Sequence, residues 1–319
     1  MTTRLWSWRS VRLRVAICIA LALTIEGLMR SNLNMAMVCM LNETAIAEGR
    51  PLRTSNSNQS ARCEVLKIGQ EKVYEYNGDL TWTSQQRAVI FASFYAGGLI
   101  ATLVTEKLNR CAGAKRLVLH GAIINVVGTF ATPAVATHMG TVPMVILRFV
   151  MGFGQGLLWP CMSVLVGHWF PPTEKSTALA IATTGNQLSV VIAMFATAEL
   201  CQLPFFGGWP MAFHVYGILG VLLCICWQVC VDDVPANALG ITDEEVQVIS
   251  NSTGRKPRVQ RANWVQLLSS PVVWAIAGSA FAHNFITVGT VTYLPLYYKT
   301  VLNMSLTSVR YLEFFKSIR

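Results

Sequence analysis

The stretch that decides the fold reads RFVMGFGQGLLWP, residues 148–160, within the apolar segment Val142–Val166. Its three glycines stand at alternate positions, but no Lys-Ser/Thr pair follows them, so they do not form a phosphate-binding loop. In a membrane, small residues let neighbouring helices approach closely, and Pro160 can kink the outgoing half of such a helix. The stretch therefore predicts a membrane helix that packs through Gly152, Gly154 and Gly156.

Seven segments of this kind occur along the chain. The 319 residues are 53% hydrophobic and only 13% charged, whereas about 25% charged residues is usual in a soluble domain. A transmembrane helix needs about 20 mostly apolar residues. The segments that qualify are Val15–Met40, Ala88–Thr105, Leu117–Ala136, Val142–Val166, Ser176–Glu199, Met211–Val231 and Val272–Tyr298. The sequence thus predicts an all-α, polytopic membrane protein in a lipid bilayer.

Loop charge predicts the orientation of these segments. The turn after the second segment is basic and contains Lys107, Arg110, Lys115 and Arg116. The turns after the third and fifth segments carry no Lys or Arg. Because basic loops face the cytosol, we expect a cytosolic N-terminus. The chain has a net charge of +9, and most of its basic residues cluster at the ends of apolar segments, where this rule expects them. The charge therefore does not indicate nucleic-acid binding.

Two glycosylation sequons support this orientation. Asn42-Glu43-Thr44 and Asn58-Gln59-Ser60 lie in the polar stretch between the first two segments, on the expected non-cytosolic side, where sequons are used. A third sequon, Asn251-Ser252-Thr253, falls on the cytosolic side and is expected to stay unmodified. Cys39, Cys63 and Cys201 could also be non-cytosolic, and their spacing leaves open whether any two form a disulfide.

The chain divides into one bundle, a linker and the beginning of a second bundle. We expect a cytosolic tail at 1–14, a six-helix bundle at 15–231 with a non-cytosolic loop at 42–87, a cytosolic linker at 232–270, and a seventh helix with the start of a second bundle at 271–319. Thr242 and Glu245 have capping-box spacing, which predicts a short helix in the linker. Six spans followed by a charged linker and a new span is how two six-helix bundles are joined. The second bundle is expected to be cut off soon after the seventh span.

Three ionisable residues lie within predicted spans, away from the obvious anchors. They are Glu26, Arg30 and Arg148, and each ionised side chain costs about 2.5–3.5 kcal/mol on insertion scales. A guanidinium matches carboxylate or phosphate in a bidentate fork, so Arg30 and Arg148 are candidate ligands of a small anionic substrate. The structural alternative is a buried pair or an anchor at the membrane surface.

Glu26 is a candidate proton carrier. It precedes Arg30 by four residues and so shares its helix face. An anion bound to Arg30 would change the pKa of this carboxylate, which could couple substrate binding to a proton. An ion pair with a purely structural role fits the same spacing.

His283 and Asn284 lie together in the seventh segment, where polar pairs usually face a cavity, so we take both as candidate substrate ligands. The sequence contains no nucleophile elbow, metalloprotease helix or metal-binding spacing of histidines or cysteines. We therefore expect no enzyme activity, cofactor or metal. The cysteines within apolar segments are interpreted as small core residues; they are Cys18, Cys161, Cys224, Cys226 and Cys230.

Several of these motifs resemble those of the major facilitator superfamily. The arginine, glycines and proline of residues 148–160 resemble its fourth-helix motif, and Gly113-Ala114-Lys115-Arg116 resembles the end of its loop motif between helices two and three. That motif's leading glycines are missing, with Thr105-Glu106 in their region.

A narrower similarity connects the chain with solute carrier family 17, the group of sialin, the type I phosphate transporters and the vesicular glutamate transporters. It rests on Arg30-Ser31-Asn32-Leu33, on residues 169–176, on residues 208–217 and on residues 294–297.

This resemblance implies an anion symporter that works by alternating access, with Arg30 and Arg148 near the substrate and Gly113, Lys115 and Arg116 in a gating loop. Two positions depart from the pattern. The helix-four acid of proton-coupled members corresponds to Gln155, and the helix-seven arginine of the glutamate transporters falls at His283. A vesicular glutamate transporter is therefore not expected, and the co-transported ion is either a proton or sodium. The plasma membrane and a lysosomal or vesicular membrane both fit the resemblance.

The alternative to a working transporter is a chain that does not transport. A truncated isoform, a fragment, or a partner that modulates a full-length relative would each fit a second bundle that is barely begun.

Overall fold

The computed structural model describes residues 10–41, 78, 80–202, 208–238, 240–252 and 264–300. These residues form helices, with one isolated bridge between Leu41 and Leu80 and no strand. The all-α fold predicted from the apolar segments is thereby confirmed. The expected glycosylation sites Asn42 and Asn58 lie outside the described residues.

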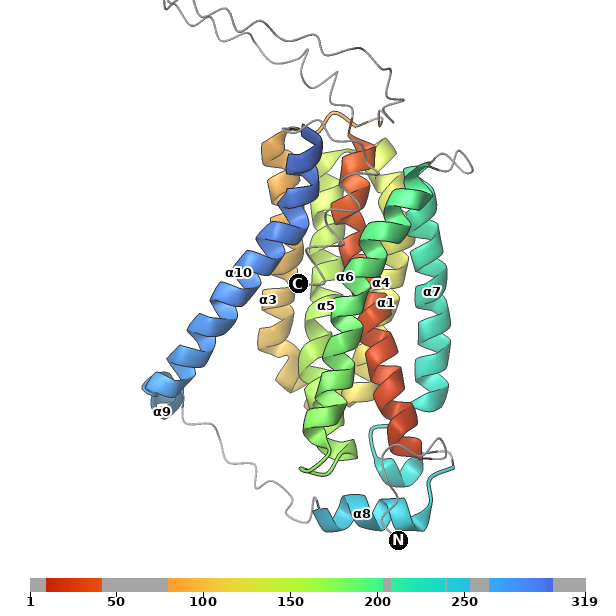
Figure 1. Cartoon of the computed structure of the whole chain (residues 1–319), viewed down its shortest axis with the longest axis vertical. Coiled ribbons are helices and arrows are strands. Elements are labelled where there is room, and N and C mark those ends of the chain that lie inside the picture. The colour runs from red at the N-terminus through yellow and green to blue at the C-terminus, as the bar shows by residue number, and fades with distance from the viewer. Residues whose placement is uncertain are drawn as a thin grey trace, which may run out of the picture.

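Seven long helices make up most of the described part of the chain (Figure 1). They are α1 (Val11–Met40), α3 (Ser84–Ala112), α4 (Ala114–Ala134), α5 (Thr141–Trp169), α6 (Lys175–Gln202), α7 (Trp209–Cys230) and α10 (Pro271–Thr300). A π-helical turn, η1 (Val135–Met139), extends α4. Helices α1 to α7 form a bundle, and α10 lies beside α3 at one end and diverges from the bundle toward the other (Figure 1).

Among the described residues, six helices are long and apolar enough to cross a membrane, namely α3, α4 with η1, α5, α6, α7 and α10. They coincide with six of the seven expected spans. The remaining expected span, Val15–Met40, lies within α1, which is not one of the six. Helix α1 has 30 residues, more than the about 20 that a bilayer requires, but it is less uniformly apolar because it contains Arg12, Arg14, Glu26 and Arg30.

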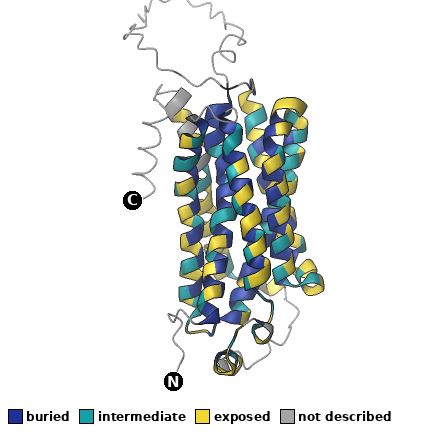
Figure 2. Ribbon diagram, turned by 90° about the vertical axis from the view of Figure 1, so that its right-hand side faces the viewer, coloured by how far each residue is buried: buried dark blue, intermediate teal, exposed yellow. Residues whose placement is uncertain are grey.

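The position of α1 explains how its polar side chains are tolerated. It packs against α6, α7, α4, α5 and α10, and most of its residues are buried. The surrounding helices bury their inner faces and expose their outer ones (Figure 2). Large apolar side chains such as Leu99, Leu103 and Ile225 stand on the outer faces. That arrangement fits lipid, because soluble monomers rarely expose large contiguous apolar surfaces.

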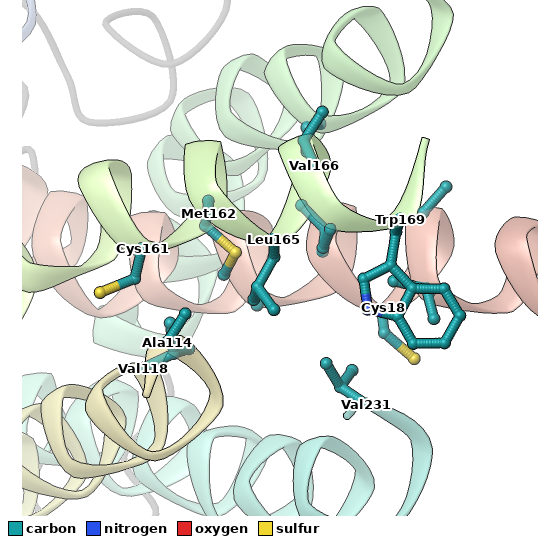
Figure 3. Close-up of a cluster of buried hydrophobic side chains, with 14 of the residues drawn as sticks. Cys18, Ala114, Val118, Cys161, Met162, Leu165, Val166, Trp169 and Val231 are labelled. Carbon is teal, nitrogen blue, oxygen red and sulfur yellow. The ribbon is translucent and has the colours of Figure 1, made fainter. Parts of the chain in front are cut away.

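A hydrophobic cluster joins α1, α4, α5, α6 and α7 near the beginning of α1 (Figure 3). Trp169, at the end of α5, is fully buried in it, and the Trp169 Nε1 donates to the Asp232 carbonyl at 2.8 Å. The ends of α5 and α7 are therefore held together just before the linker begins.

Glycines set the contacts of α5 with its neighbours. A Cβ atom on Gly152 would overlap the Phe94 carbonyl of α3, and one on Gly156 would lie 2.5 Å from the Gly98 carbonyl oxygen of the same helix. A Cβ atom on Gly154 would lie 2.9 Å from the Gly121 carbonyl oxygen of α4. Each glycine thus allows a backbone approach that any larger residue would prevent.

After the bundle, the described residues form three short helices, η3 (Pro235–Asn237), α8 (Asp243–Ser252) and α9 (Trp264–Leu268). Helix α8 begins where the capping-box spacing predicts a helix, and the Glu245 backbone N–H donates to the Thr242 Oγ1 at 3.4 Å. Figure 1 shows α8 beyond the end of the bundle at which α1 begins.

Candidate functional site

A cavity of about 430 Å³ opens between α1, α3, α5, α6 and α10. The four substrate ligands proposed from the sequence, on three different helices, all line it; they are Arg30, Arg148, His283 and Asn284. Aromatic side chains make up much of the remaining wall, which includes Phe91, Phe94, Tyr95 and Trp159. The cavity therefore combines two cations with an apolar lining.

Arg148 supplies the more deeply placed cation. It lies on α5, one turn before Gly152, and is 2% exposed. Its Nε and Nη2 atoms are buried without a hydrogen-bond partner, and the described residues include no carboxylate that pairs with it. A buried, uncompensated charge is costly unless a partner of opposite charge binds it. This guanidinium is therefore prepared to receive an anion.

Arg30 reaches the same cavity from α1 and is half-buried. Its Nη2 donates to the Asn186 Oδ1 of α6 at 3.4 Å. This single long contact with a neutral amide fixes the direction of the side chain and leaves its charge unneutralised. Two guanidinium groups from opposite helices thus face one space.

Glu26 does not form the ion pair with Arg30 that their spacing allows. Among the described residues no such pair is within 4 Å. The Glu26 Oε2 instead accepts from the Asn125 Nδ2 of α4 at 2.8 Å. Glu26 is 1% exposed, and its Oε1 has no hydrogen-bond partner. The carboxyl group lies behind the cavity wall, one helical turn from Arg30.

Helix α10 contributes the polar pair of the opposite wall. His283 and Asn284 are both exposed, and the Asn284 Nδ2 donates to the Ala280 carbonyl at 2.8 Å. The Tyr293 ring of α10 lies 6.5 Å from the Phe91 ring of α3 in an edge-to-face arrangement. This contact holds α10 against the mouth of the cavity at one end of the bundle.

Sequence reasoning missed the amide side chains that α4 and α6 bring to the site. Asn186 and Gln187 of α6 line the cavity, and Asn125 holds Glu26. All three stand inside predicted spans, where an amide side chain is unusual enough to be noticed. Asn32, quoted above only as part of a motif, has a structural role, because its Oδ1 accepts from the Thr197 Oγ1 of α6 at 3.0 Å. The Thr197 hydroxyl in turn lies 3.1 Å from the Tyr216 hydroxyl of α7.

The residues expected in a gating loop meet the end of α7. Gly113 separates α3 from α4 with φ +82°, a conformation that favours glycine. The Lys115 backbone N–H donates to the Asp233 Oδ1 at 2.6 Å, and its Nζ donates to the Asp232 Oδ1 at 2.8 Å. Arg116 is exposed beside them. The loop is thereby tied to the first acidic residues of the linker.

A second polar cluster ties α8 to the start of α1. The Ser10 Oγ donates to the Glu245 Oε1 at 2.6 Å, and the Arg12 Nη1 donates to the Glu174 Oε2 at 2.6 Å. The Arg12 Nε lies 3.8 Å from the Glu245 Oε1. Arg12 and Glu245 are buried, so the linker helix is docked on the bundle by charge as well as by packing.

Comparison with known proteins gives one family. The family model described as Major Facilitator Superfamily matches residues 19–315. Human sialin is 28% identical over 297 residues, which cover 93% of this chain and 58% of sialin. A putative inorganic phosphate cotransporter of Drosophila melanogaster is 29% identical, with 88% of this chain and 52% of the relative covered. An uncharacterized transporter of Caenorhabditis elegans, slc-17.2, is 29% identical, with 94% and 60% covered.

The chain thus spans about half to three fifths of the length of these relatives. Solved structures agree on the fold. A bacterial homolog of the human lysosomal transporter Spinster, inward-facing and unoccupied, superposes with a TM-score of 0.62 at 14% identity, covering 94% of this chain and 58% of that one. A D-xylose-proton symporter gives 0.60 at 13% identity, with 97% and 66% covered.

Proposed function

The chain belongs to the Major Facilitator Superfamily, and from that premise we propose that it supplies the anion-binding wall of a membrane transporter. The observation that carries the proposal is Arg148, a buried guanidinium with two unpartnered nitrogens on the wall of a cavity. Arg30 adds a second cation from α1. An anion held between the two would offset part of their positive charge and satisfy donors that are otherwise unpaired.

The lining favours an organic anion. The cavity volume of about 430 Å³ lies within the range of sites for drug-sized molecules, about 300–1,000 Å³. Phe91, Phe94, Tyr95 and Trp159 offer apolar surface to a carbon skeleton, while the arginines take its carboxylate. The relatives are named as sialin and as inorganic phosphate cotransporters, so inorganic phosphate is the comparison substrate.

Transport would proceed by alternating access with a co-transported proton or sodium. The superfamily membership and the likeness to transporter structures support a rocking movement of one bundle against another. Helix α10, which leans away from the bundle, provides the polar pair His283 and Asn284 on the far side of the cavity. Closure of that side around the anion would bring this pair toward Arg30 and Arg148.

Equilibrium binding tests the anion site without requiring transport. In lipid nanodiscs, the chain is titrated with a panel of radiolabelled carboxylates and with inorganic phosphate. Charged hydrogen bonds contribute about 1.5–3 kcal/mol each, so Arg148→Gln and Arg30→Gln should each weaken binding about tenfold to a hundredfold.

The matched control is Arg110→Gln, which removes an exposed arginine that pairs with Glu106 on the outside of α3. This variant should bind as the unmodified chain does. The site would be refuted if the Arg148→Gln and Arg30→Gln variants bound the anions with the same affinity as the unmodified chain. A preference for phosphate over every carboxylate would assign the cavity to the inorganic ion instead.

A further inference from the structure

Three cysteines from two helices meet close to the end of α7. Cys18 of α1 faces Cys226 and Cys230 of α7, and the three sulfur atoms all lie within 4.8 Å of one another. Cys18 is buried and the other two are half-buried. Within the described part of the chain, no other three histidine, cysteine or acidic side chains come together in this way.

The spacing of the sulfur atoms matches that around a metal ion. A thiolate binds Zn²⁺ at about 2.3 Å, so two thiolates on a tetrahedral or trigonal ion lie about 3.8–4.0 Å apart. The Cys226 and Cys230 sulfur atoms are already 3.9 Å apart, because residues four apart share one helix face. Bringing Cys18 to the same distance requires sulfur movements of about 1 Å or less, within reach of a small side-chain rotation.

A purely apolar role does not account for this convergence. Cys161 lies in the same hydrophobic cluster and is fully buried, yet it is not one of the three thiols that meet. As a small core residue, Cys161 needs no sulfur neighbour. Cys18, Cys226 and Cys230 instead place three soft donor atoms around one point between two helices.

We propose that Cys18, Cys226 and Cys230 form a three-thiolate site for a soft metal ion, Zn²⁺ or Cu⁺, that bridges α1 and α7. Thiolates select these ions over harder cations. Three thiols that bind as thiolates release three protons for each ion bound. With Zn²⁺, a water molecule can take the fourth position from the half-exposed side of Cys226 and Cys230. With Cu⁺, the three sulfur atoms complete the coordination.

The location suits such a site. Cys230 is the last residue of α7, and α7 ends on the side of the bundle where α8 lies (Figure 1), which is the predicted cytosolic side. Thiols in the cytosol stay reduced and remain available as ligands. Figure 3 shows Cys18 beside Trp169 and Val231, so an ion here would also brace the junction between the bundle and the linker.

Metal titration of the purified chain tests the proposal. The protein, in detergent with a thiol-free reductant, is dialysed against Zn²⁺ or, without oxygen, against Cu⁺. Bound metal is measured by atomic emission, and released protons by a pH dye. We expect one ion per chain, release of up to three protons, and a higher melting temperature.

Two sets of variants decide the outcome. Cys226→Ser and Cys18→Ala should lose the stoichiometric ion, the proton release and the metal-dependent rise in melting temperature. Cys161→Ala, in the same core, and Cys111→Ala, an exposed thiol, should keep all three. The site is refuted if neither ion binds the unmodified chain, or if the first pair of variants binds metal as the controls do. Binding of one ion and not the other would show which of the two metals the three thiolates select.

Discussion

The carboxyl group of Glu26 lies in the interior of the bundle, and only one of its two oxygens accepts a hydrogen bond. Asn125 donates to its Oε2, its Oε1 has no partner, and Arg30 stands one turn away at the cavity. An anion that occupies Arg30 would remove part of the field that favours an ionised carboxyl group. The substrate and a proton would then bind cooperatively. We hypothesise that Glu26 takes the proton-coupling role that the family resemblance implies for a helix-four acid, whose position is occupied here by Gln155.

Proton uptake on anion binding measures this coupling directly. A carboxylate with a pKa far below the assay pH is added to the chain in weak buffer, and we expect up to one proton taken up per anion bound. Glu26→Gln keeps an oxygen for Asn125 and should bind the anion without proton uptake. Glu106→Gln, which changes an acid with a 72% exposed side chain, should behave as the unmodified chain. Undiminished proton uptake by the Glu26→Gln variant would assign coupling to another group.

The sequence predicted the arginines of the candidate site and the polar pair of α10, but not the amides of α4 and α6. Arg30 and Arg148 were recognisable because a charge in an apolar segment is costly and therefore rare. Asn125 and Asn186 give a weaker signal, because an uncharged amide is tolerated where a membrane helix meets another helix. Which neighbour each amide meets depends on packing between helices far apart in sequence. The turn of Glu26 toward α4, and away from Arg30, could not be predicted for the same reason.

At the scale of single helices, α5 shows how glycines fix the position of Arg148. Gly152 follows Arg148 by one turn and lets the α5 backbone touch the Phe94 carbonyl of α3. Gly152→Ala would place a methyl group in that contact and force the helices apart, at a cost of about 1–3 kcal/mol. We expect a lower melting temperature in detergent and weaker anion binding, because Arg148 moves with its helix.

Helix α5 contains its own control. Gly167 lies near its end, and a Cβ atom there would meet nothing within 4 Å. Gly167→Ala should stabilise the helix by up to about 1 kcal/mol through helix propensity alone. A Gly152→Ala variant as stable as the Gly167→Ala variant would show that the α3–α5 contact tolerates separation.

Helix ends were harder to predict than helix centres. The second apolar segment was expected at Ala88–Thr105, whereas α3 runs from Ser84 to Ala112. Apolar character marks the part of a helix that lies in hydrocarbon, but hydrogen bonding continues until a cap ends it. Here Thr83 and Gln86 form a capping box at the start, and Gly113 ends the helix. Both signals are local in the sequence. They predict the helix ends correctly once the helix is known to extend beyond its apolar segment.

For the whole molecule, the two ends of the bundle differ in a way that topology mapping can test. Helix α1 ends at the end of the bundle opposite to α8 (Figure 1), so we predict that Asn42, two residues after α1 in the sequence, and Asn251 of α8 face opposite sides of the membrane. With a cytosolic N-terminus, we expect glycans on Asn42 or Asn58 and none on Asn251. Glycosidase treatment of single Asn→Gln variants expressed in animal cells would show this as mobility shifts. A glycan lost only in the Asn251→Gln variant would reverse the orientation.

The hydrogen bond between Glu26 and Asn125 joins positions that are 99 residues apart. A ribosome adds about 5–20 residues per second, so about 5–20 s pass between the synthesis of the carboxyl group and that of its amide partner. During that interval α1 has already been synthesised, and it carries Glu26 and Arg30 within its apolar segment. Each of these side chains costs about 2.5–3.5 kcal/mol in lipid if it is ionised. Helix α1 is therefore made well before the helix that satisfies its carboxyl group, and we expect its stable insertion to wait for the synthesis of α4.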